Sequence, residues 1–140
     1  MIVPALTFHA TATPLKQLNA VPVVCDVESD TGNINPLDVE KNISSKTKAV
    51  MLAHTLGNPF NVKKVREICD KYNLWLVVDC CDALGAKYNE QHVGTFGDIA
   101  TCSFYPAHHI TMGEGGAVFT NYEELIPIAA SFRDWGRDCY

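Results

Sequence analysis

Residues 49–79, AVMLAHTLGNPFNVKKVREICDKYNLWLVVD, contain two apolar runs separated by one amphipathic segment. The runs 49–54 and 74–79 have the length and composition of strands that are buried in a parallel sheet. Between them, apolar side chains recur at helical spacing, and Asn61 is placed to cap that helix. A strand, a helix and a second strand in this order predict a βαβ unit.

Strand and helix patterns alternate along the rest of the chain. Further strands are predicted at residues 2–6, 21–27, 99–105 and 116–120, the last two buried like those of the opening stretch. Further helices are predicted at residues 9–19, 36–42 and 123–135. The buried stripe of the central helix should consist of Val62, Val65, Ile68, Cys69 and Tyr72. The predicted fold class is therefore α/β, with a mostly parallel sheet flanked by helices.

Composition excludes several classes of protein. The 140 residues suffice for one domain, and the net charge of -5 does not favour a nucleic-acid partner. No apolar run approaches the roughly 18 residues of a membrane span, and residues 1–14 do not resemble a signal peptide. The chain begins inside an apolar strand pattern and ends at Tyr140 without a helix-terminating signal, so we expect a fragment of a longer protein.

Cysteine usage indicates a reducing, cytoplasmic location. The six cysteines mostly lie in apolar strand or helix patterns, where cysteine acts as a small hydrophobe, and none forms a C-x-x-C pair. Cys80 and Cys81 have no histidine nearby in sequence to activate them, so packing is favoured over a nucleophilic role.

Ligands of open α/β sheets gather at the carboxyl ends of strands. Here that rule selects His54, Asp79 and the stretch after Tyr105. Asp79 follows five apolar residues, and its carboxylate is either a cap for the turn that follows or a buried anion that holds a cation.

Residues 103–116, SFYPAHHITMGEGG, combine a serine, two adjacent histidines and three glycines. A histidine is suited to proton transfer near neutral pH, whereas a metal site would need further ligands at helical spacing that are absent here. His108 and His109 cannot face the same way on extended chain, so one is expected to face a ligand while the other packs. A lone serine such as Ser103 is a phosphate donor only rarely.

Taken together, the segments resemble the DegT/DnrJ/EryC1/StrS family of sugar aminotransferases, which use pyridoxal 5'-phosphate (PLP) and have fold type I. The resemblance rests on IVPALTFHATATP, VPVVCDVESDTGNI, TKAVMLAHTLGNP, VVDCCDALGAKYNEQHVGTFGDIATCSF and GEGGAVFTN, in this order and spacing. It implies that residues 1–140 form part of the large, cofactor-binding domain. An N-terminal phosphate-binding turn and a small C-terminal domain would then be absent.

The resemblance also implies roles for individual residues. Asp79 matches the aspartate that pairs with the pyridine nitrogen of the cofactor, Phe8 the aromatic side chain that stacks on the ring, and Ser103 a phosphate-contacting serine. Asp82 stands near the cofactor ring, where most members have glutamine or histidine. His108 occupies the position of the lysine that tethers PLP. Because an imidazole cannot form that tether, we expect a non-covalent cofactor, pyridoxamine 5'-phosphate (PMP), with His108 as the catalytic acid–base.

This departure is similar to the sugar 3-dehydratase branch of the family. It implies loss of the C3 hydroxyl from a nucleotide-linked 4-keto-6-deoxyhexose, CDP-4-keto-6-deoxy-D-glucose in particular, in dideoxysugar and O-antigen lipopolysaccharide biosynthesis. The implied partners are a second copy of the chain and a flavin or iron–sulfur reductase. Cys139 would be a first [2Fe–2S] ligand, the other ligands lying beyond residue 140. A nucleotide-sugar aminotransferase and a non-catalytic truncated copy remain alternatives.

Overall fold

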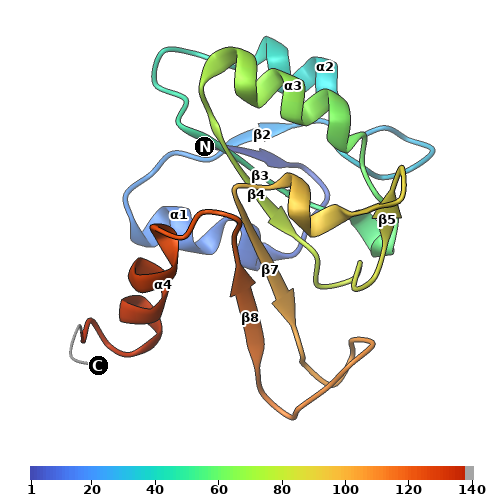
Figure 1. Cartoon of the computed structure of the whole chain (residues 1–140). Helices are drawn as coiled ribbons and strands as arrows, with labels where there is room; N and C mark the ends of the chain where they lie inside the picture. The colour runs from blue at the N-terminus through green and yellow to red at the C-terminus, as the bar shows by residue number, and fades with distance from the viewer. Residues whose placement is uncertain (138–140) are drawn as a thin grey trace.

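The βαβ unit predicted from residues 49–79 is the centre of the fold (Figure 1). The computed structural model describes residues 1–137. Strand β3 (Ala49–Ala53) runs parallel to β4 (Trp75–Asp79), and helix α3 (Val62–Tyr72) connects them after a short 3-10 helix, η2 (Thr55–Gly57). The side chain of Asn61 accepts a hydrogen bond from the backbone N–H of Lys64, which confirms the predicted cap.

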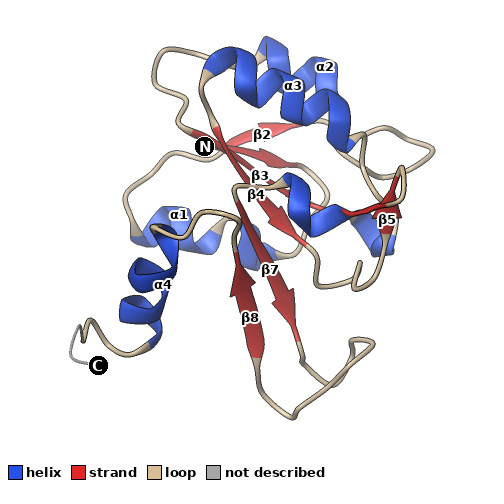
Figure 2. Cartoon of the chain, in the orientation of Figure 1, coloured by secondary structure: helices blue, strands red, loops and turns tan. Residues whose placement is uncertain are grey.

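The other strands extend this unit on both sides into one sheet with the order β2-β1-β3-β4-β7-β8 (Figure 2). These are β1 (Ile2–Pro4), β2 (Val23–Cys25), β7 (Ile99–Ser103) and β8 (Gly116–Phe119). All neighbours are parallel except β8, which runs antiparallel to β7. The α/β class with a mostly parallel sheet is thus confirmed.

The remaining elements are short helices and one small hairpin. Helix α2 (Pro36–Lys41) lies beside α3, whereas α1 (Thr13–Gln17) and α4 (Leu125–Arg133) are both drawn at the lower left of Figure 1. The predicted helix at 9–19 is divided into η1 (His9–Thr11) and α1. Strands β5 (Lys87–Tyr88) and β6 (Gln91–His92) form the hairpin, and η3 (Val93–Phe96) leads to β7. In the described chain, no helix combines the length and apolar character that crossing a membrane requires.

The core lies between α3 and the sheet. Its members include four residues of the predicted helical stripe and alternate residues of β3 and β4: Val62, Val65, Ile68, Cys69, Val50, Leu52, Leu76 and Val78. The prediction was wrong for Tyr72, which is 39% exposed. The Tyr72 hydroxyl donates to Glu40 Oε1 at 3.2 Å, because the last turn of α3 projects toward α2 rather than over the sheet.

The prediction that residues 116–120 form a buried strand was also wrong. All four residues of β8 are exposed, and Val118 is 60% exposed. Within residues 1–137 this strand pairs only with β7, so it forms an edge of the sheet. An apolar sequence alone could not distinguish an edge strand from a central one, because both carry β-branched and aromatic side chains.

Candidate active site

The sheet register brings the candidate residues to one edge. Ala53 pairs with Asp79 across β3 and β4, and Asp79 pairs with Thr101 across β4 and β7. Because side chains alternate along a strand, Asp79, Thr101 and Ser103 lie on the same face of the sheet. The expected meeting of these strand ends at one carboxyl edge is therefore confirmed.

Asp79 caps the turn that follows β4. Its Oδ1 accepts a hydrogen bond from the backbone N–H of Cys81 at 2.9 Å. An ionised carboxylate has about four acceptor positions, so this bond leaves capacity for a cationic partner. The cap, one of the two interpretations of Asp79, is present, and it is compatible with the other.

The same turn carries a second carboxylate, which contacts a histidine in the loop after β7. Asp82 Oδ1 lies 3.1 Å from Nδ1 of His108. The His108 side chain is 20% exposed and that of Asp82 is 50% exposed. Asp82 follows the end of β4 and His108 follows the end of β7, two adjacent parallel strands. The contact thus joins residues that are far apart in the sequence.

The backbone of the loop between β7 and β8 separates the two histidines. The N–H of His108 donates to the carbonyl of Tyr105 at 2.9 Å, which closes a tight turn around Pro106. His108 is half-buried against Asp82, whereas His109 is exposed. The expectation that the pair diverges is confirmed, but His109 does not pack.

Close backbone contact fixes the turn that holds Asp82. Gly57, in η2, has a φ of +82°, and a Cβ at this position would lie 2.5 Å from the backbone oxygen of Asp82. Only glycine fits both the left-handed conformation and the space. The stretch after β3 therefore supports the turn after β4 directly.

Two further candidates lie at the same edge but outside this contact. Ser103 Oγ accepts a hydrogen bond from the N–H of Tyr105 at 3.2 Å, which leaves the hydroxyl hydrogen available for an anion. Phe8 follows β1, is 69% exposed and packs its ring against His9 at 4.2 Å. Helix η1, which Phe8 precedes, contacts β3. Phe8 thus follows the carboxyl end of β1, a strand parallel to β3, and its ring is exposed.

His54 belongs to the core. It is 2% exposed, stacks on Phe60 at 4.4 Å, and its Nδ1 accepts the backbone N–H of Phe60 at 3.3 Å. Burial lowers the pKa of His54 to about 4, against the opposing effect of the Asp79 charge. The imidazole is therefore neutral at pH 7 and does not compete as a cationic partner of Asp79.

The cysteines of the site are inert. Burial raises the pKa of both Cys80 and Cys81 to about 12, and the Asp79 carboxylate adds to this effect. Neither thiol ionises at neutral pH, which agrees with packing rather than nucleophilic chemistry. Cys139, the candidate iron–sulfur ligand, lies outside the described residues. Among residues 1–137, no group of histidine, cysteine or acidic side chains has the geometry of a metal site.

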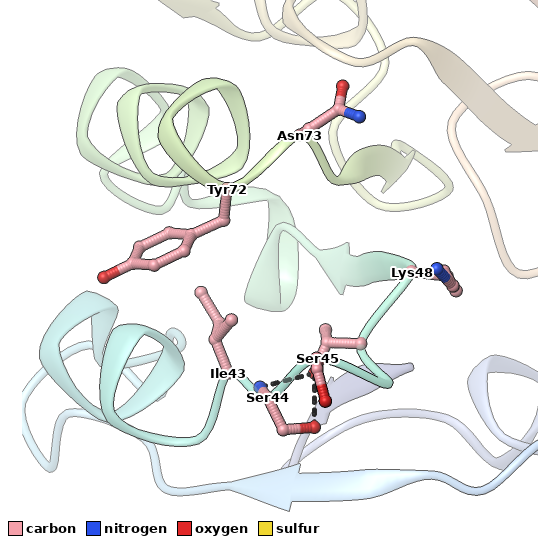
Figure 3. Close-up of a pocket in the computed structure, with 7 residues that line it drawn as sticks. Ile43, Ser44, Ser45, Lys48, Tyr72 and Asn73 are labelled. Atoms are coloured by element: carbon pink, nitrogen blue, oxygen red, sulfur yellow. Dashed lines mark hydrogen bonds between the residues drawn. The ribbon is translucent and has the colours of Figure 1, made fainter.

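Two surface cavities lie away from this edge. One, of about 440 Å³, is lined by Ser44, Thr47, Lys48 and Tyr72 (Figure 3). It adjoins Lys48, which precedes β3, and so lies at the opposite end of that strand from His54. The other, of about 720 Å³, lies between β8 and α4. Neither is lined by Asp79, Asp82 or His108.

The fold is shared with solved structures of PLP-binding sugar-nucleotide enzymes. The Escherichia coli GDP-4-keto-6-deoxy-D-mannose-3-dehydratase, solved with bound hydrated PLP, matches with a TM-score of 0.88 and 32% identity, over 94% of this chain and 34% of that chain. The chain belongs to the DegT/DnrJ/EryC1/StrS aminotransferase family, whose sequence profile matches residues 1–139. These findings confirm three expectations from the sequence: the family, its fold type and the dependence of the family on PLP.

Two curated relatives match the whole chain at 50% identity or more. The lipopolysaccharide biosynthesis protein RfbH of Salmonella typhimurium is 60% identical over 140 residues, and the chain covers 32% of it. The dTDP-4-dehydro-2,6-dideoxy-D-glucose 3-dehydratase of Saccharopolyspora spinosa is 50% identical over 140 residues, 30% of its length. The chain thus spans about a third of the length of these relatives.

The contact between Asp82 and His108 was not predicted from the sequence. Asp82 was assigned to the cofactor ring on resemblance alone. The signal that could have found the pair is positional, because each residue follows the carboxyl end of one of two strands that later prove to be neighbours.

Proposed function

We propose that this chain is part of the cofactor-binding large domain of a PMP-dependent sugar 3-dehydratase. Its substrate class is a nucleotide-linked 4-keto-6-deoxyhexose, with CDP-4-keto-6-deoxy-D-glucose as the first candidate, in dideoxysugar and O-antigen biosynthesis. The observation that carries the proposal is His108, which is held at the carboxyl edge in a loop that contains no lysine. The two relatives that match the whole chain at 50% identity or more, one of them named a 3-dehydratase, support it.

The residues at the edge fit the cofactor. Asp79 offers a carboxylate with free acceptor capacity, which would keep a pyridine nitrogen protonated. Ser103 offers a hydroxyl hydrogen to a phosphate, and the exposed ring of Phe8 offers a stacking surface. When bound, the cofactor supplies an amine for the C4 ketone of the sugar and an electron sink for the adjacent bonds.

His108 supplies the proton transfer in this proposal. With the cofactor bound, a neutral His108 imidazole would take up a proton from the cofactor's C4' carbon and would give a proton to the departing C3 hydroxyl. The loop contains no lysine, and an imidazole cannot replace the lysine amine as a covalent tether. Nothing in this loop would therefore hold PLP covalently between turnovers. Elimination at C3 is then favoured over ordinary transamination.

Further partners belong to the same proposal. Completing the deoxygenation requires electrons, which we assign to a separate flavin or iron–sulfur reductase. A [2Fe–2S] cluster would need about four ligands, of which Cys139 is the candidate within this chain. We also propose a homodimer that works in the cytoplasm.

His108→Lys tests the assignment of this position. We expect the variant to bind PLP covalently after borohydride reduction, which adds the mass of the reduced cofactor to the intact protein. The wild-type protein should gain no such mass. Absence of attachment in a folded variant with Asp79 intact would contradict the proposal.

A sugar aminotransferase is the second candidate, since the family is named for that activity. Formation of 2-oxoglutarate from glutamate in the presence of the keto-sugar nucleotide would support it against dehydration. A protein that fails to bind PMP in calorimetry would instead be a non-catalytic copy.

A further inference from the structure

We infer that Asp82 is the positioning residue of His108: it holds the imidazole by Nδ1 and leaves Nε2 as the atom that accepts the proton. The inference rests on the proposed function for the role of His108, but the pairing stands on geometry. It replaces the assignment of Asp82 as a cofactor ligand.

The tautomer follows from the contact itself. An ionised carboxylate only accepts hydrogen bonds, so a neutral imidazole nitrogen that faces it must carry the hydrogen. Nδ1 of His108 lies 3.1 Å from Oδ1 of Asp82, which places the hydrogen on Nδ1 and the lone pair on Nε2. A fixed lone pair is what a general base requires.

Both partners are held by their backbones. His108 follows the turn closed by its N–H bond to Tyr105, and the loop is tied again by the bond from Met112 N–H to Phe104 O at 3.0 Å. Asp82 stands in the turn closed by the bond from Ala83 N–H to Cys80 O at 2.9 Å, with Gly57 packed against it. The pair is therefore set by two supported turns and not by two long flexible side chains.

Stability does not explain the contact. The Asp82 side chain is 50% exposed, and exposed ion pairs contribute roughly 0–1 kcal/mol. The neighbouring carboxylate has a different contact, since Asp79 Oδ1 accepts the N–H of Cys81. Two carboxylates of one turn thus have separate duties: Asp79 caps the turn and faces the cofactor, and Asp82 orients the histidine.

The test compares Asp82→Asn, Asp82→Glu and the control Glu67→Gln in the full-length protein that carries this chain, first without PMP and then with PMP bound. Glu67 lies exposed on α3, and its replacement by glutamine removes the same charge at a position away from the site. Long-range 1H–15N spectra of 15N-histidine-labelled protein at pH 8, without PMP, report the tautomer of His108. His108→Gln assigns its signals.

We expect hydrogen on Nδ1 in the wild type and in the control, and a mixture of tautomers in Asp82→Asn, whose amide can also donate to Nδ1. With PMP bound, kcat of Asp82→Asn should fall about 10- to 100-fold, the usual cost of losing an orienting partner. KM and PMP affinity should change less than about twofold, and Asp82→Glu should recover part of the loss.

Three results would overturn the inference. They are hydrogen on Nε2 in the wild type, an unchanged kcat in a folded Asp82→Asn variant, and a loss of PMP affinity as large as the loss of kcat. The last would restore Asp82 as a cofactor ligand. A wild-type enzyme that does not dehydrate the keto-sugar would defeat the proposed function, whereas the tautomer measurement would still decide the pairing.

Discussion

The neutral state of His54 makes the stability of the fold depend on pH. The pKa of this buried imidazole is lowered from 6.5 to about 4, with burial as the main cause. The folded state therefore resists protonation that the unfolded chain accepts. The contribution of His54 is fully present above the unfolded value near 6.5 and is lost as the pH falls toward 4.

The size of the effect follows from the shift. One pKa unit corresponds to about 1.4 kcal/mol, so the full contribution is about 3 kcal/mol. Between pH 7.5 and pH 5 the unfolded imidazole becomes mostly charged while the folded one stays mostly neutral. The free energy of unfolding should therefore fall by about 2 kcal/mol through His54 alone.

The measurement is urea unfolding at a series of pH values for the wild type, His54→Asn and His92→Asn. Asparagine at position 54 can still accept the N–H of Phe60, and the exposed His92 serves as the control. The stability difference between the wild type and His54→Asn should shrink by about 2 kcal/mol from pH 7.5 to pH 5. The control should follow the wild type. A difference that stays constant over this range would refute the argument that burial keeps His54 neutral.

Three further substitutions test contacts that hold the fold. Gly57→Ala should cost about 1–3 kcal/mol in urea unfolding and lower kcat, because its Cβ would displace the Asp82 turn; unchanged values would contradict the close approach. Asp98→Ala should cost about 1–3 kcal/mol, because it leaves the buried N–H of Leu76 without its acceptor and leaves Arg66 with Asp70 as its carboxylate partner; an unchanged free energy of unfolding would sink this reasoning. Asn61→Ala should cost about 1 kcal/mol by removing the cap of α3, and the same assay would expose the error if stability did not change.

The sequence was sufficient for the elements whose patterns are local. The strands at 49–54 and 74–79, the helix between them and its Asn61 cap follow from hydrophobic periodicity and capping chemistry, and the structure has all of them. From these, the edge at which Asp79 lies could be predicted, because parallel strands end together. Which strands are neighbours and which lie at an edge is decided by tertiary packing, and this is why the burial of residues 116–120 was predicted wrongly.

The same limit explains the candidate site. Resemblance placed Phe8, Asp79, Asp82, Ser103 and His108 near a cofactor, and the register of the sheet brings the strands that carry them to one edge. Their pairing is a matter of which turn faces which. That information becomes available only when β4 and β7 are known to be adjacent.

The adjacency also bears on the choice between the two candidate reactions. A loop of residues 104–115 joins β7 to β8, and the side chain that it directs at the Asp82 turn is an imidazole. An imidazole can take up and return a proton at one fixed atom, but it cannot bond covalently to an aldehyde as an amine does.

The amine must then arrive with the cofactor. A reaction that consumes that amine stoichiometrically would stop after one turnover without a donor, whereas elimination followed by transfer of two electrons from the proposed reductase would return it with the cofactor. Under the proposed function, the Asp82–His108 pair serves proton transfer coupled to loss of a hydroxyl group, and we expect that the first dehydration step does not require a donor such as glutamate.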